Sequence, residues 1–264
     1  MKSQVQWEAA CRLEREQLQS FLSRQLARRP LEAFVNDSFA QLLSLDTPPL
    51  PKLRDQLRAF HDRLGYCAKG SLKSGGLCVG TLYRTREFIE QHQEQRIGSK
   101  KIVGIIGDAR TVHVEHTVPV RELALGIARL DAAARRNRHF LLAWLLRHSV
   151  ATAFAKGQER FHKGFTSSSL VFDRTADAEF NRPFARYFHL RAGAPEVWNI
   201  WSGQIVEPGR FTFDSHIEMM LDLLRECGAS ASALDRIAHH ADEMGGRPND
   251  NDVRLSCSAG WMSD

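Results

Sequence analysis

The chain carries a short apolar stretch that a proline ends: His113-Val114-Glu115-His116-Thr117-Val118-Pro119. Together with the turn-forming pair Gly107-Asp108 and the apolar residues around it, this stretch is typical of a β-ribbon. Pro119 has no amide hydrogen, so it predicts the end of the strand. Glu115 and His116 are therefore expected at a strand end that a substrate can reach.

Neighbouring side chains of a strand point to opposite faces, so Glu115 and His116 cannot bind one ion side by side. They suit a division of labour instead. The Glu115 carboxylate holds a hard cation, while the His116 imidazole takes a proton from water. The alternative is an ordinary strand with a surface His and Glu.

The same stretch resembles the first strand of the HNH (ββα-metal) nucleases, in which an acidic residue, a His and two mostly apolar residues precede a Pro. The resemblance covers Val112 to about Leu123 well and the residues after it loosely. It implies a metal-dependent endonuclease that hydrolyses DNA phosphodiester bonds with Mg2+ or Mn2+. In that scheme Glu115 is a metal ligand and His116 is the general base.

The resemblance also implies a second metal ligand on the following helices, and His148 is the best chemical match because a neutral imidazole ligates divalent metals. Asn137 would hold the loop that orients the general base. Here the chain departs from the family, whose Asn-to-His spacing is shorter. His139 and His162 remain rivals for the ligand, and a structural role remains open for each histidine.

Composition bounds the class of protein. The 264 residues are 43% hydrophobic and 25% charged, as in a globular protein with a real core. No run approaches the roughly 20 apolar residues of a membrane span. Five scattered cysteines form no Cys-x-x-Cys motif, which favours reduced thiols and a cytoplasmic location.

The chain has a net charge of +5, and arginine predominates among its basic residues, which favours a polyanionic partner. We therefore expect double-stranded DNA as the partner, with phosphate contacts from arginines near the motif. The candidates are Arg135, Arg136, Arg138 and Arg186. A solvated helix end is the alternative for the first three, and pairing with a buried acid is the alternative for Arg186.

Hydrophobic periodicity predicts an α+β chain that is mostly helical, with the HNH-like motif at its centre and a small C-terminal strand pair. Three parts are expected: a helical subdomain over residues 1–65, the nuclease core over 66–190, and a C-terminal part over 191–264. Helices are predicted at 4–29, 31–45, 52–64, 82–95, 122–136, 137–159, 217–227 and 232–244, and two strands near 197–201 and 210–213.

Among nucleases, the large flanking helical parts favour a restriction or defence enzyme, acting as a homodimer that makes two nicks. Two other classes stay open: a nucleic-acid-binding module without catalysis and a delivered nuclease toxin. A metallohydrolase of small substrates would use His113, Glu115 and His116 together, which the alternation of a strand disfavours.

Overall fold

A computed structural model describes residues 4–66, 81–90, 112–155, 181–184, 187, 195–207 and 209–245. Within these ranges the protein is mixed α+β, mostly helical, with one five-stranded mixed sheet. The predicted fold class is confirmed at this level. The ribbon expected before residue 112 lies outside the described residues.

The helices begin and end at residues with clear capping chemistry. Asn36 accepts a hydrogen bond from the amide of Phe39, and Thr212 accepts one from the amide of Ser215. Gly65 ends its helix in the left-handed region, at φ 80°. The helices are α1 (Gln4–Arg28), α2 (Asp37–Leu43), α3 (Leu50–Leu64), α5 (Val120–Arg129), α6 (Ala132–Arg136), α7 (Arg138–His148), α9 (Phe213–Glu226) and α10 (Ala231–Gly245), with a 3-10 turn at Leu31–Phe34.

The sheet has the strand order β2-β3-β1-β4-β5. Its strands are β1 (Tyr83–Thr85), β2 (Val112–His116), β3 (Ala151–Ala155), β4 (Val197–Asn199) and β5 (Gln204–Ile205). Strand β3 runs parallel to β1 and antiparallel to β2, and β4 is antiparallel to both of its neighbours. Among the described strands, β2 and β5 are therefore the outermost.

Two predicted helices are wrong in part. Residues 83–85 form β1, at the start of the helix predicted over 82–95, and residues 151–155 form β3, inside the helix predicted over 137–159. All residues of both strands are buried. A strand that is covered on both faces has no polar alternation, so a short run of this kind cannot be told from a buried helix by its pattern.

The C-terminal strand pair is present with a shifted second strand. Strand β4 pairs with Gln204–Ile205 instead of with residues 210–213. The single helix predicted over 122–136 is divided in two, because Leu130 and Asp131 separate α5 from α6 and the Asp131 side chain caps α6.

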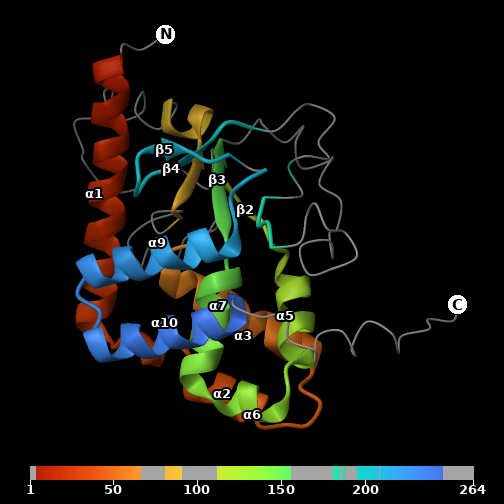
Figure 1. Cartoon of the computed structure of the whole chain (residues 1–264). Coiled ribbons are helices and arrows are strands. Elements are labelled where there is room, and N and C mark those ends of the chain that lie inside the picture. The colour runs from red at the N-terminus through yellow and green to blue at the C-terminus, as the bar shows by residue number, and fades with distance from the viewer. Residues whose placement is uncertain are drawn as a thin grey trace, which may run out of the picture.

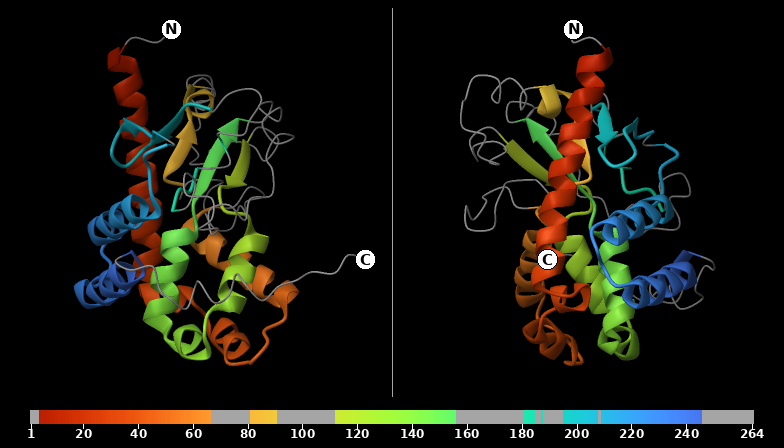
Figure 2. Two further views of the ribbon diagram at one scale, coloured as in Figure 1. Left: turned by 45° about the vertical axis from the view of Figure 1, so that its right-hand side comes forward. Right: turned by 90° about the vertical axis from the view of Figure 1, so that its left-hand side faces the viewer.

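The sheet occupies the upper part of the molecule, and α2, α3, α5, α6, α7 and α10 form its lower part (Figure 1). The long helix α1 runs beside both parts, as the side view shows (Figure 2). A fully buried ion pair between Glu14 and Arg84 ties α1 to β1. Helix α9 lies against the other face of β1, where Oη of Tyr83 bonds Nδ1 of His216 at 2.6 Å.

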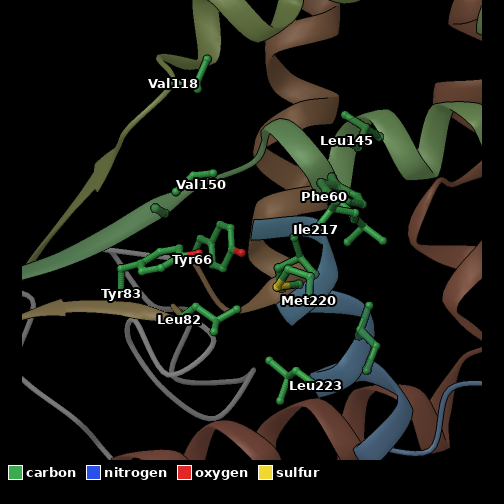
Figure 3. Close-up of a cluster of buried hydrophobic side chains, with 14 of the residues drawn as sticks. Phe60, Tyr66, Leu82, Tyr83, Val118, Leu145, Val150, Ile217, Met220 and Leu223 are labelled. Atoms are coloured by element: carbon green, nitrogen blue, oxygen red, sulfur yellow. The ribbon is translucent and has the colours of Figure 1, made fainter. Parts of the chain in front are cut away.

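One hydrophobic cluster runs through all three ranges expected as separate parts, from Trp7 to Ala241. Figure 3 shows where this cluster joins the sheet to the helices. Val118 lies just after β2, Val150 lies just before β3, and Phe60 comes from α3. Helix α9 adds Ile217 and Met220. This junction places the end of β2 directly above the helical layer.

Candidate functional site

Strand β2 divides the predicted site residues between two faces. In the pairing with β3, Glu115 lies opposite Thr152, and His116 lies opposite Ala151. Side chains alternate along a strand, so His113 and Glu115 share one face while His116 points to the other. The expected placement of Glu115 and His116 on opposite faces is therefore confirmed, and the roles assigned to them stay predictions.

On the first face, Nε2 of His113 lies 3.6 Å from Oε2 of Glu115. The two side chains are 38% and 13% exposed, so solvent still reaches the imidazole while the carboxylate is mostly covered. Directly across the strand pair, Thr152 is fully buried, and its hydroxyl has no hydrogen-bond partner among the described residues. This face thus gathers a carboxylate, an imidazole and a hydroxyl.

On the second face, the half-buried ring of His116 stacks on the ring of His61 from α3. The ring centroids are 4.7 Å apart and the planes are inclined by 30°. Nε2 of His61 shares a hydrogen bond of 3.0 Å with Oγ of Ser149, which orients the His61 ring. His116 therefore packs on His61, whose own ring is fixed by Ser149 at the end of α7.

Burial holds the pKa of His61 well below its usual range, and the nearby His116 lowers this pKa further. A buried imidazole is neutral near neutral pH because desolvation penalises its charged form. Of the two stacked rings, His116 is the partly exposed one, although its Nε2 atom is buried.

The end of β2 leads directly into a helix, as the motif predicts. The amide of Thr117 donates to the carbonyl of Val150 at 2.9 Å, which extends the pairing with the β3 segment by one residue. Val118 is buried, Pro119 stands at the N-cap, and α5 begins at Val120. A missing amide hydrogen at this position costs nothing, since the first amides of a helix have no partner within it.

His148 ends α7, its Nδ1 bonds the carbonyl of Trp144 at 2.8 Å, and its ring packs against Trp144 and Phe213. Burial, followed by the charge of Arg147, lowers the pKa of His148 to about 3. The contacts that position the His148 imidazole thus come from Trp144 of α7 and Phe213 of α9.

Asn137 lies at the opposite end of α7, which has 11 residues. At 1.5 Å per residue, Asn137 is roughly 16 Å from the His148 end of the helix. Its side chain accepts hydrogen bonds from the amides of His139 and Phe140, so it caps α7. The structure therefore gives Asn137 a capping role far from the His116 ring.

The three neighbouring arginines bind α2 and the loop after it. Arg135 is 5% exposed and donates to the carbonyl of Asp46. Arg136 and Arg138 are exposed, and they reach the carbonyl of Ser44 and the carboxylate of Asp37. Arg135 is thus too buried to meet a phosphate, whereas the other two are accessible. Arg186 lies outside the described residues.

Of the two rival histidines, the structure describes only His139, which lies on α7. Nε2 of His139 lies 3.9 Å from a Glu32 oxygen, and His162 lies outside the described residues. Within the described ranges, no three His, Cys, Asp or Glu side chains converge into a group that could hold a metal ion. None of the described helices is long and apolar enough to cross a membrane.

Comparison with known proteins adds no family. No family model, curated protein or solved structure matches this chain.

Sequence reasoning missed His61, Ser149 and Thr152. The first two lie 88 positions apart in the chain, and no local pattern links either to His116. Thr152 carried a weak signal, because it is the one polar residue of the strand Ala151–Ala155. That signal could be used only once the segment was known to be a strand opposite Glu115.

Proposed function

We propose that this chain is a metal-dependent nuclease that hydrolyses phosphodiester bonds in double-stranded DNA. The observation that carries the proposal is strand β2, with Glu115 beside His113 on one face and His116 backed by His61 on the other. Because β2 is outermost among the described strands, a phosphate beyond its edge is within reach of both faces.

The residues beside Glu115 fit a hard divalent cation such as Mg2+. Carboxylate and hydroxyl oxygens are ligands that such ions prefer, and Mg2+ needs few protein ligands because it keeps several waters. The unpartnered hydroxyl of Thr152 supports this fit. Glu115 and His113 would hold the ion, with His113 in the role that the motif assigned to His148. When bound, the ion offsets negative charge on the scissile phosphate.

In the proposed reaction, His116 accepts a proton from the attacking water. The water oxygen forms a bond to phosphorus as the bond from phosphorus to the leaving 3′ oxygen breaks, and solvent protonates that oxygen. Stacking on His61 keeps the His116 ring from rotating, which favours one direction of attack. Burial lowers the pKa of His61, which makes it a poor proton acceptor and leaves His116 as the proposed one.

Exposed arginines near α6 and α7 are the proposed phosphate contacts. Arg136 and Arg138 each donate one hydrogen bond from a guanidinium nitrogen to α2 or to the loop after it. A guanidinium has further N–H donors that can bind a phosphate. Contacts of this kind position the DNA backbone without reading its sequence.

A restriction or defence role in the cytoplasm, with a homodimer making two nicks, is the biological setting we propose. Cys11 and Cys227 are both free and buried, which fits a reducing compartment. A homodimer would convert supercoiled plasmid to linear DNA, whereas a monomer would accumulate nicked circles.

The test is incubation of the purified chain with supercoiled plasmid in Mg2+, in Mn2+ and in EDTA. The proposal expects cleavage with either metal and none in EDTA. Metal-independent binding without cleavage would favour a nucleic-acid-binding module instead. Failure both to cleave and to bind DNA would reject the nucleic-acid function altogether.

A further inference from the structure

Thr152 is the least explained polar residue of the sheet. It sits in β3, between β2 and β1, where the strand pairing places it directly opposite Glu115 on one side and Tyr83 on the other. Residues paired in this way share a face of the sheet. Glu115, Thr152 and Tyr83 therefore form a row across three strands.

The hydroxyl of Thr152 is buried at a cost. Thr152 is 0% exposed, and its Oγ1 has no hydrogen-bond partner within the part of the chain that the structure describes. Valine has the same shape and suits a buried strand, and every other residue of β3 is apolar. A buried polar group without a partner is unfavourable, so a hydroxyl at this position calls for a partner beyond the described residues.

The neighbours of Thr152 indicate what that reason is. The hydroxyl of Tyr83 bonds Nδ1 of His216 and makes no hydrogen bond to the Thr152 hydroxyl. On the other side stand Glu115 and, 3.6 Å from it, His113. The Cβ atoms of directly opposed residues are about 4.5–5.5 Å apart, which lets the two side chains reach one shared small ligand.

We propose that Thr152 is the third protein donor of a divalent-cation site formed with Glu115 and His113. This inference rests on the proposed nuclease function and names a residue that the motif does not contain. The site combines one carboxylate, one imidazole and one hydroxyl, a set that an oxygen-preferring cation such as Mg2+ or Mn2+ accepts. The cation then gives the hydroxyl the partner that the described residues do not supply.

The experiment is titration of the full chain with Mn2+ alone. Calorimetry and the electron paramagnetic resonance signal of free Mn2+ both measure the binding. Thr152→Val removes the hydroxyl and keeps the shape, whereas Thr152→Ser keeps the hydroxyl. We expect Thr152→Val to weaken Mn2+ binding by about 10- to 100-fold and Thr152→Ser to bind nearly as the original chain does. Glu115→Gln should weaken binding at least as much.

Thermal unfolding separates this role from a structural one. Removing a hydroxyl that has no partner should leave the melting temperature of Thr152→Val in EDTA equal to or above that of the original chain. A clear fall in that temperature would mean that the hydroxyl is structural, and would overturn the proposal. Equal Mn2+ affinity in Thr152→Val and the original chain, or no Mn2+ binding by the original chain, would also overturn it.

Plasmid cleavage distinguishes the two proposals from each other. Mn2+ binding that depends on Thr152, in a chain that cleaves no DNA, keeps the cation site and rejects the nuclease. Metal-dependent cleavage that is identical in Thr152→Val and the original chain keeps the nuclease and rejects Thr152 as a donor.

Discussion

The ring of His116 stacks on the ring of His61 with centroids 4.7 Å apart, although one residue belongs to β2 and the other to α3. His61 is almost fully buried and His116 is partly exposed. The pair therefore joins a buried ring of the helical layer to a partly exposed ring at the end of β2. The stack makes the orientation of His116 a property of two elements together.

The first prediction concerns His116 as general base. His116→Ala should lower the rate of plasmid cleavage by about 10²- to 10⁴-fold, the usual contribution of a positioned base, while the circular dichroism spectrum is kept. His139→Ala is the matched control, because His139 lies on α7 beside Glu32 and away from β2. Near-normal cleavage by His116→Ala would remove His116 from the mechanism.

The second prediction concerns His61 as a positioning residue. His61→Phe keeps a flat ring under His116, whereas His61→Leu removes it. We expect His61→Leu to reduce kcat by up to about 100-fold through misplacement of the base, with little change in KM. His61→Phe should retain more of kcat than His61→Leu. Equal kcat in the two variants would show that stacking does not orient His116.

The third prediction separates the arginines by their exposure. If Arg136 and Arg138 contact phosphates, replacing both by Gln should flatten the log-log dependence of DNA binding on salt by about 1 to 2 units. Arg135→Met should leave that slope unchanged, because its side chain is buried against the loop at Asp46. Fluorescence anisotropy across a salt series measures the slopes. A flatter slope in Arg135→Met than in the double variant would contradict this assignment.

The fourth prediction concerns acid stability. Burial lowers the pKa of both His148 and His216 to about 3, against 6.5 in an unfolded chain. Below pH 6.5 the unfolded chain binds protons that the folded chain refuses, so stability is complete above this pH and falls as pH drops toward 3. Each histidine contributes a slope of up to about 1.4 kcal/mol per pH unit.

Urea unfolding between pH 7.5 and pH 5 measures this slope. His61 adds to the loss in the same direction, since its pKa is also lowered. His216→Gln should make the dependence on pH shallower, because one titrating group is removed while Gln can still accept a hydrogen bond from Tyr83. A free energy of unfolding that stays constant down to pH 5 would disprove the buried neutral state of these rings.

The fifth prediction tests the packing of α5 on α7. A Cβ atom at Gly126 would lie 2.8 Å from Cζ2 of Trp144. Gly126→Ala normally stabilises a helix, but here the overpacking should lower the free energy of unfolding by about 1 to 3 kcal/mol. Adding Trp144→Phe should recover part of this loss. Stabilisation by Gly126→Ala alone would mean that the two helices are less closely packed.

Several local elements could be read from the sequence because their signals are local. The apolar spacing of α3, α9 and α10 predicted helices whose ends lie within a few residues of those found. The strand that ends before Pro119 and the helix after it were likewise expected. The central strands β1 and β3 were not, because strands buried on both faces carry no alternation.

The sequence by itself determined where β2 ends, that Glu115 and His116 leave it on opposite faces, and that a helix follows. These properties depend on the backbone preferences of neighbouring residues and on the missing amide hydrogen of Pro119. Only the tertiary structure decided that β2 pairs with β3, that His61 supports His116, and that Thr152 faces Glu115. These contacts join residues far apart in the chain, so packing of the whole core selects them and no local pattern encodes them.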